Sequence, residues 1–154
     1  MPTVLLIAAL LSSGFGPTTS GLQLAVKIDS KASAAEFHVL NTSKSARTFV
    51  ERYSCSGLSH FSISLGKSRA KLDTHYHWEG KVRGLTTKIT TRCTVNVPVK
   101  FRTVKPGKTA VITIPFAKPG SLLSGNHRVL RADALLMLRG NISFTHLRSR
   151  FVTP

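Results

Sequence analysis

Acidic residues are scarce in this chain of 154 residues, which has 6 Asp and Glu against 22 Lys and Arg and a formal net charge of +16. The six acids are scattered along the sequence. Glycosidases and aspartic proteases need two carboxylates that act together, so the sequence argues against enzymes of those kinds. The motifs Gly-x-Ser-x-Gly, His-Glu-x-x-His and Gly-x-x-x-x-Gly-Lys are also absent. We therefore expect a protein that is not an enzyme.

Charge is missing altogether from the first 26 residues, which include an apolar run from Val4 to Leu11 and the turn-forming stretch 14–20. This pattern is typical of a secretory signal peptide, here residues 1–20, followed by one domain over 21–154. It predicts a secreted, periplasmic or extracellular protein. No basic residue precedes the apolar run, and the alternative is a buried N-terminal strand or helix of a cytosolic domain. Eight apolar residues are too few to span a bilayer, which takes about 20, so we expect no transmembrane segment.

Cysteine is limited to Cys55 and Cys93. In an exported chain the simplest expectation is one disulfide between them. The alternative is two buried free thiols, and it becomes the better interpretation if the chain is cytosolic.

Aromatic residues make up only 7% of the chain and do not alternate with basic residues as base-stacking surfaces require. We therefore do not expect the protein to recognise a specific nucleic-acid sequence. The basic residues instead run at even spacing from Lys27 to Arg150, which indicates a folded basic surface that attracts a protein or an acidic polymer. Outward strand positions predict that Lys27, Lys100 and Arg102 bind a polyanion. The alternative is charge that serves solubility in general.

Alternation of apolar and polar residues is the main structural signal, and it predicts strands with one buried face. The expected buried positions are Leu22, Leu24, Val26 and Ile28; Phe61, Ile63 and Leu65; Cys93, Val95, Val97, Val99 and Phe101; and Ala110, Ile112, Ile114 and Phe116. Further strands are expected over 35–40 and 47–53. Turn formers at 41–45 and 105–108 separate these strands. The pattern predicts an all-β, antiparallel immunoglobulin-like β-sandwich of about seven to eight strands.

Two segments interrupt this regularity. The stretch 66–91 has no clear period and is interpreted as a long polar excursion between the sheets. The stretch 127–138 is rich in Leu and Ala and lies between Asn126 and Gly140, which could cap a short helix. A buried strand is the favoured interpretation, because the final segment 142–152 needs a partner strand.

One local cluster has donor atoms at a useful spacing. On a strand, His75, His77 and Glu79 point to the same face, and two imidazoles with a carboxylate can bind zinc or copper. His60 could add a fourth ligand. The alternative is an ordinary solvated surface, and no other cofactor is expected.

Several stretches resemble the immunoglobulin-like modules of secreted proteins. They are Phe37 to Thr42, Thr48 to Val50, Val104 to Thr109, Val111 to Phe116, Gly125 to Val129 and Phe151 to Thr153. In this respect the chain resembles the BsuPI-type proteinase inhibitors and the N-terminal domains of some secreted metallopeptidases. The resemblance implies a β-sandwich and, as a second function, a protease inhibitor or protease-associated module. His127 stands where the family has an aromatic residue, and 66–91 has no counterpart.

Taken together, the sequence favours an exported, non-enzymatic β-sandwich that binds a protein or a polyanionic surface polymer through a basic surface. Three alternatives remain open: the protease inhibitor, a small metal-binding exported protein, and a basic coat or ribosome-associated protein.

Overall fold

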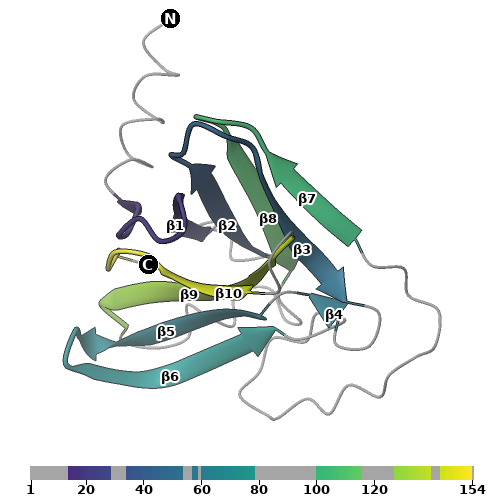
Figure 1. The fold of residues 1–154 in the computed structure, drawn as a ribbon. Helices are drawn as coiled ribbons and strands as arrows, with labels where there is room; N and C mark the ends of the chain where they lie inside the picture. Colours follow the sequence, from purple (N-terminus) through teal and green to yellow (C-terminus); the bar gives the residue numbers. More distant parts are fainter. Residues whose placement is uncertain are drawn as a thin grey trace, which may run out of the picture.

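The computed structural model describes residues 14–28, 34–53, 57–58, 60–78, 100–115, 127–139 and 143–153. Within these ranges, ten β-strands form two antiparallel sheets, one of three strands and one of seven (Figure 1). Apolar side chains of both sheets pack together in one cluster between them. The protein is therefore an all-β sandwich, as the strand patterns predict.

The smaller sheet has the strand order β1-β2-β8, with β2 in the middle. Its strands are β1 (Leu22–Ile28), β2 (Ala34–Asn41) and β8 (Thr109–Pro115). The register pairs Val26 with Phe37 and Phe37 with Ile112, so buried residues of the three strands lie side by side.

The larger sheet follows the order β4-β3-β9-β5-β6, while β7 pairs with β3 and β10 pairs with β9. Its strands are β3 (Arg47–Tyr53), β4 (Gly57–Leu58), β5 (His60–Ser68), β6 (Lys71–Trp78), β7 (Lys100–Val104), β9 (Val129–Leu138) and β10 (Ser143–Arg148). The long strand β9 contacts β3, β5 and β10 and is the centre of this sheet.

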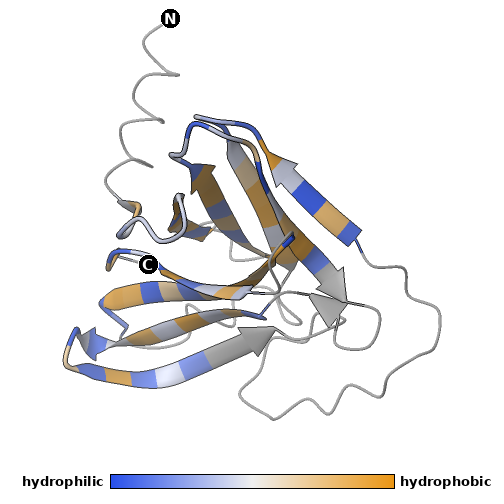
Figure 2. Cartoon of the chain, viewed as in Figure 1, coloured by the Kyte–Doolittle hydropathy of each residue, from blue (hydrophilic) through white to orange (hydrophobic). Residues whose placement is uncertain are grey.

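The core lies where the two sheets face each other. Phe37 of β2 and Phe61 of β5 meet across it with ring centroids 4.8 Å apart. Figure 2 shows the alternation of apolar and polar residues along the strands that produces this single buried layer. Fully burying a large apolar side chain contributes about 1.5–3 kcal/mol, so this layer is the main source of stability.

The expected buried faces of β1, β5 and β8 are confirmed for most of their residues, since Leu24, Ile63 and Ile112 are all buried, while Ile28 is only partly buried. The other residues expected to be buried lie outside the described residues: Cys93, Val95, Val97, Val99 and Phe116. The turn at 105–108 is confirmed as well. Gly107 adopts a φ of 71°, and the Lys108 amide donates to the Lys105 carbonyl at 3.0 Å. A positive φ at this position favours glycine, as in a type II turn.

The strand favoured for 127–138 is confirmed, because Val129–Leu138 is strand β9, and the short helix considered as its alternative is wrong. Burial alternates along it, with Leu130, Ala132, Ala134 and Leu136 fully buried. Three neighbouring strands supply backbone hydrogen-bond partners for this segment, and this pairing outweighs the helix propensity of its Leu and Ala residues.

Two further expectations are wrong. The stretch 66–91 was expected to be a polar excursion, but its first part completes β5 and forms β6, which pair as a hairpin through a turn at Arg69 and Ala70. Phe101 was expected to be buried, but it is 46% exposed while Val104 is buried. The strand β7 therefore turns its other face to the core.

Residues 14–20 pack against the sandwich. Phe15 is buried, and the Gly16 amide donates to the Leu24 carbonyl at 3.0 Å. The Gln23 side chain donates to the Gly16 carbonyl at 2.9 Å, and the Arg150 amide donates to the Gly14 carbonyl at 3.2 Å. Residues 1–13 lie outside the described ranges, and the prediction of a signal peptide stays a prediction. The described part of the chain contains no helix long and apolar enough to cross a membrane.

Candidate functional site

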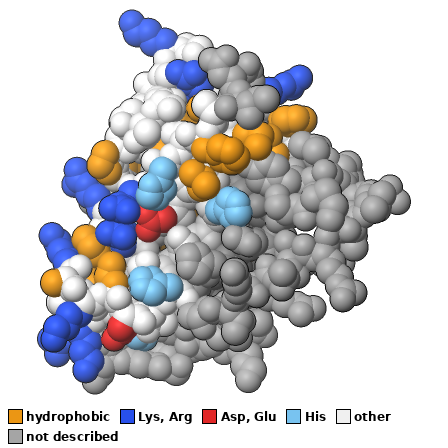
Figure 3. Space-filling view, turned by 60° about the horizontal axis from the view of Figure 1, so that its bottom comes forward, with side chains coloured by type: hydrophobic (Ala, Val, Ile, Leu, Met, Phe, Trp, Pro, Cys, Tyr) orange, Lys and Arg blue, Asp and Glu red, His pale blue; other side chains and the backbone are white. Residues whose placement is uncertain are grey.

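The outer face of strands β6, β5, β9 and β10 is polar and rich in histidine. Because side chains alternate along a strand, burial of Phe61, Ile63 and Leu65 in the core places their neighbours His60, Ser62 and Ser64 on the opposite face of the sheet, where Ser64 is covered by its surroundings. The register then places further polar residues on the same face. These are His75 of β6, Arg131 and Asp133 of β9, and His146 and Arg148 of β10. Figure 3 shows histidine, acidic and basic side chains close together on one side of the molecule.

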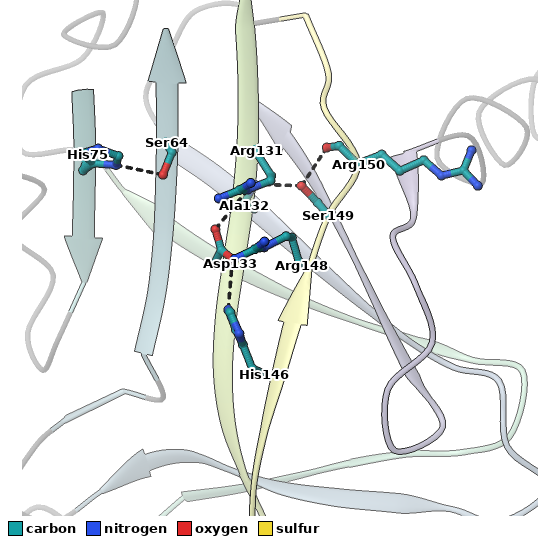
Figure 4. Close-up of polar contacts among 9 residues, drawn as sticks. All are labelled: Ser64, His75, Arg131, Ala132, Asp133, His146, Arg148, Ser149 and Arg150. Atoms are coloured by element: carbon teal, nitrogen blue, oxygen red, sulfur yellow. Dashed lines mark hydrogen bonds and ion pairs between the residues drawn. The ribbon is translucent and has the colours of Figure 1, made fainter. Parts of the chain in front are cut away.

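Asp133 is the centre of this face (Figure 4). Its Oδ1 lies 3.0 Å from His146 Nε2 and 2.9 Å from Arg148 Nε, and its Oδ2 lies 3.5 Å from Arg131 Nε. The Asp133 side chain is only 14% exposed. One carboxylate therefore offsets part of the charge of two guanidinium groups, and the face keeps a positive balance.

A serine fastens the end of the chain beside this cluster. The Ser149 hydroxyl accepts a hydrogen bond from the Ala132 amide at 2.8 Å and donates one to the Arg150 carbonyl at 2.9 Å (Figure 4). The amide and carbonyl of Leu130 exchange hydrogen bonds of 2.8 Å with Val152. These bonds hold residues 149–152 along the first half of β9.

Phe151 is held between two arginines as a result. The guanidinium carbon of Arg69 lies 5.2 Å from the ring centroid of Phe151, and that of Arg131 lies 5.5 Å from it. Both distances are within the range of cation–π contacts. The contacts join the β5–β6 turn to β9 and fix two guanidinium groups at the surface.

Four exposed cations lie at or beside the β5–β6 turn, Arg69 of the Phe151 contact among them, and we call them the basic corner: Lys67, Arg69, Lys71 and Arg128. The first three belong to the β5–β6 hairpin, and the Arg128 amide donates to the Gly66 carbonyl of the same hairpin at 2.9 Å. None of the four forms an ion pair with any residue in the described ranges. The acidic residue nearest in sequence to these cations is Asp73. Four positive charges against one nearby carboxylate give the basic corner a strongly positive net charge.

The three residues predicted to bind a polyanion are not brought together. Lys27 is exposed on β1 of the smaller sheet, whereas Lys100 and Arg102 lie on β7 of the larger one. Lys100 Nζ lies 3.7 Å from Glu51 Oε1, and Arg102 Nε lies 3.0 Å from Glu51 Oε2. Glu51 is buried, so much of the charge of these two cations is already balanced. Their role in polyanion binding stays a prediction.

The predicted metal ligands are described only in part. His75 is exposed, and its Nδ1 lies 2.9 Å from the Ser64 hydroxyl. The register pairs residue 77 with Ser62, while Glu79 is outside the described residues. No group of three metal-ligating side chains occurs within the described ranges. Zinc or copper binding therefore stays a prediction. Cys55 and Cys93, the expected disulfide, also lie outside the described residues.

Sequence reasoning missed the basic corner because the turn at Arg69 and Ala70 contains neither Gly nor Pro. The signal that could have found it is the alternation of Leu72, Thr74 and Tyr76 with Lys71, Asp73 and His75. That pattern has the period of a strand and would have placed the basic turn at the end of a hairpin.

No protein-family model matches the chain, and no curated protein matches its sequence. The resemblance to BsuPI-type modules accordingly stays a prediction.

Proposed function

We propose that this chain is a non-enzymatic, exported binding module that holds a polyanionic polymer on its basic outer surface. The observation that supports this proposal best is the basic corner, where four exposed cations lie together without an ion pair to any described residue. A polymer with closely spaced anionic groups can contact several of these cations at once, and the release of its counterions favours binding. Export is supported only by the uncharged, apolar N-terminal stretch of the sequence.

The fixed arginines suit this role. Arg69 and Arg131 are held against Phe151, so they lose little conformational freedom when an anionic group binds. The Asp133 carboxylate keeps Arg131 and Arg148 within one cluster on the same face. A folded surface of this kind favours the regular charge spacing of a polymer over a single small anion.

Binding of labelled heparin fragments at several salt concentrations tests the proposal. The triple variant Lys67→Gln, Lys71→Gln, Arg128→Gln should bind more weakly, and the slope of log K against log salt should fall by up to about three, one for each cation that contacts the polymer. The matched control is Lys44→Gln, Lys105→Gln, Lys108→Gln, which removes three exposed cations from the loops at 42–46 and 105–108.

The control should keep most of the affinity and of the salt slope. Equal losses in both triple variants would show that general charge, not the basic corner, attracts the polymer. Binding that does not respond to salt would contradict the proposal altogether.

A further inference from the structure

Four apolar residues of the larger sheet lie side by side across four strands. The register pairs Phe101 of β7 with Val50 of β3. It then pairs Val50 with Met137 of β9, and Met137 with Phe144 of β10. Directly paired residues of an antiparallel sheet point to the same face, so we call these four residues the apolar row. At about 4.8 Å between neighbouring strands, the row is about 14 Å long.

The apolar row lies on the face of the sheet that points away from the core. The core residues on the same four strands are Val104 of β7, Phe49 of β3, Leu136 of β9 and Leu147 of β10. Each of them is an odd number of positions from the member of the row on its own strand. Because successive side chains of a strand point to opposite faces, the row occupies the outer face.

Both ends of the apolar row are exposed to solvent. Phe101 is 46% exposed and Phe144 is 54% exposed. Between them, Met137 is partly exposed and Val50 is buried. Single apolar residues on a surface are ordinary, whereas a contiguous apolar patch with a polar rim is typical of an interaction site. Figure 3 shows hydrophobic side chains at the surface beside histidine and acidic side chains.

Cations border the apolar row at both ends. The guanidinium carbon of Arg139 lies 4.9 Å from the ring centroid of Phe101. Arg139 is exposed and forms no ion pair with a described residue. On β10, Arg148 follows Phe144 by four positions and lies on the same outer face, where it contacts Asp133. The charge of Arg139 is therefore available to a carboxylate of a partner.

We infer that the apolar row binds an acidic protein segment, whose large apolar side chains contact Phe101 and Phe144 and whose carboxylate pairs with Arg139. Aromatic residues, Met and Arg are enriched at protein interfaces, and this surface combines all three. A second copy of the chain does not fit, since each copy carries a net charge of +16 and the two would repel each other. The row is separate from the basic corner, and the inference does not depend on polymer binding there.

Amide NMR of the full chain with three synthetic peptides tests the inference. In the first peptide, three Phe residues alternate with Ser between two pairs of Glu. Ser replaces each Phe in the second peptide, and Lys replaces each Glu in the third. The first peptide should shift the amide signals of the apolar row in a saturable manner. The second should bind at least about tenfold more weakly, because it buries no aromatic ring, and the third should not bind, because its charge is repelled.

Variants separate the apolar contribution from the charge. Phe144→Ser should weaken binding of the first peptide by about tenfold and leave the affinity for the second peptide unchanged. Arg139→Gln should weaken binding of both peptides by up to about fivefold, the usual contribution of an exposed ion pair. The matched control is Val111→Ser, which removes an exposed apolar side chain from β8 of the smaller sheet and should leave binding unchanged.

Three results would overturn the inference: no shift of the row signals, equal affinity for the first two peptides, or equal losses in Phe144→Ser and Val111→Ser. A thymidine oligonucleotide that shifts the same signals as strongly as the first peptide would also overturn it. Such a result would assign the row to single-stranded nucleic acid, whose bases stack on aromatic rings. A failure of heparin to bind would contradict the proposed function and leave the outcome of the peptide test unaffected.

Discussion

Asp133 joins two arginines and a histidine from two neighbouring strands. Its side chain is largely buried, whereas those of His146 and Arg148 are about half exposed. Exposed ion pairs contribute little, and removal of one partner from a buried pair costs several kcal/mol. The ion pairs of Asp133 are neither fully exposed nor fully buried, so their contribution to stability lies between those two cases. The same carboxylate lowers the positive charge of the outer face, and Asp133 therefore affects both stability and charge.

The substitution Asp133→Asn is expected to lower the free energy of unfolding by about 1–2 kcal/mol, since Arg131 and Arg148 lose their carboxylate. It should at the same time strengthen heparin binding, because the outer face gains one net positive charge. Urea denaturation and heparin titration measure the two effects. Asp73→Asn is the control, because exposed Asp73 forms no ion pair with a described residue. An equal loss of stability in both variants would contradict the central role of Asp133.

Asn41 shows how one buried amide can organise a loop. It is fully buried, and its Nδ2 donates to the carbonyls of Ser45 and Val104 at 2.8 Å each. Its Oδ1 accepts from the amide and the hydroxyl of Ser43. Every hydrogen-bonding group of this side chain is used, so Asn41 joins the β2–β3 connection to β7.

Replacement of Asn41 by Asp keeps the shape but removes both donors and places a charge against two carbonyls. We expect a loss of about 3 kcal/mol in unfolding free energy, the usual cost of unsatisfied buried groups. Ser43→Ala is the milder comparison, because it leaves the Asn41 amide bonds in place. Thermal unfolding followed by circular dichroism ranks the two variants. A loss for Asn41→Asp no greater than for Ser43→Ala would show that the amide donors contribute little.

At the scale of the element, β9 decides the architecture of the larger sheet. Its even-numbered residues from Leu130 to Leu136 are fully buried, and its odd-numbered residues, which include Arg131 and Asp133, lie on the outer face. A single strand therefore supplies both the core and the candidate site. In a helix the same residues would spread around the axis and could not divide into these two faces.

Leu136→Ala should cost about 2–5 kcal/mol, because it opens a cavity in the core. Leu135→Ala, on the neighbouring residue with its side chain on the outer face, should cost less than about 1 kcal/mol. Denaturant unfolding of the two single variants measures the difference. Similar losses at both positions would contradict the strand register of β9.

At the scale of the whole molecule, basic side chains lie at both ends of the larger sheet. The basic corner lies at the β5–β6 turn, and a pocket lined in part by Arg47 and Arg139 lies where β9 ends. The segment 14–20 adds to the sandwich by hydrogen bonds to Leu24, Gln23 and Arg150. It is therefore part of the folded unit, although its sequence has the small residues of a cleavage region.

Truncation tests whether residues 14–20 are part of the folded unit. Removal of residues 1–20 deletes Phe15 and the hydrogen bonds of Gly14 and Gly16, and should lower the unfolding free energy by about 2–4 kcal/mol relative to removal of residues 1–13. Urea unfolding of the two truncated proteins measures the difference. Equal stability would show that the segment contributes little, and would agree with cleavage near Ser20.

The fold was largely predictable, whereas the site was not. The alternation in β1, β5 and β8 identified these strands and their buried residues, since a strand with one buried face must alternate. The same rule failed for β7, because pairing with β3 turns its other face to the core and Arg139 packs over Phe101. It also did not identify β6, since its turn lacks Gly and Pro.

The sequence by itself determined an all-β chain, its strong positive charge and the scarcity of carboxylates, because these depend on composition and on local periodicity. The tertiary structure alone decided which charges meet. The sequence predicts that Lys100 and Arg102 bind a polyanion, whereas the sheet places both of them beside Glu51. Arg69 and Phe151 are far apart along the chain and meet because residues 149–152 pair with β9. Contacts of this kind depend on strand order and register, which the spacing of residues in the sequence does not specify.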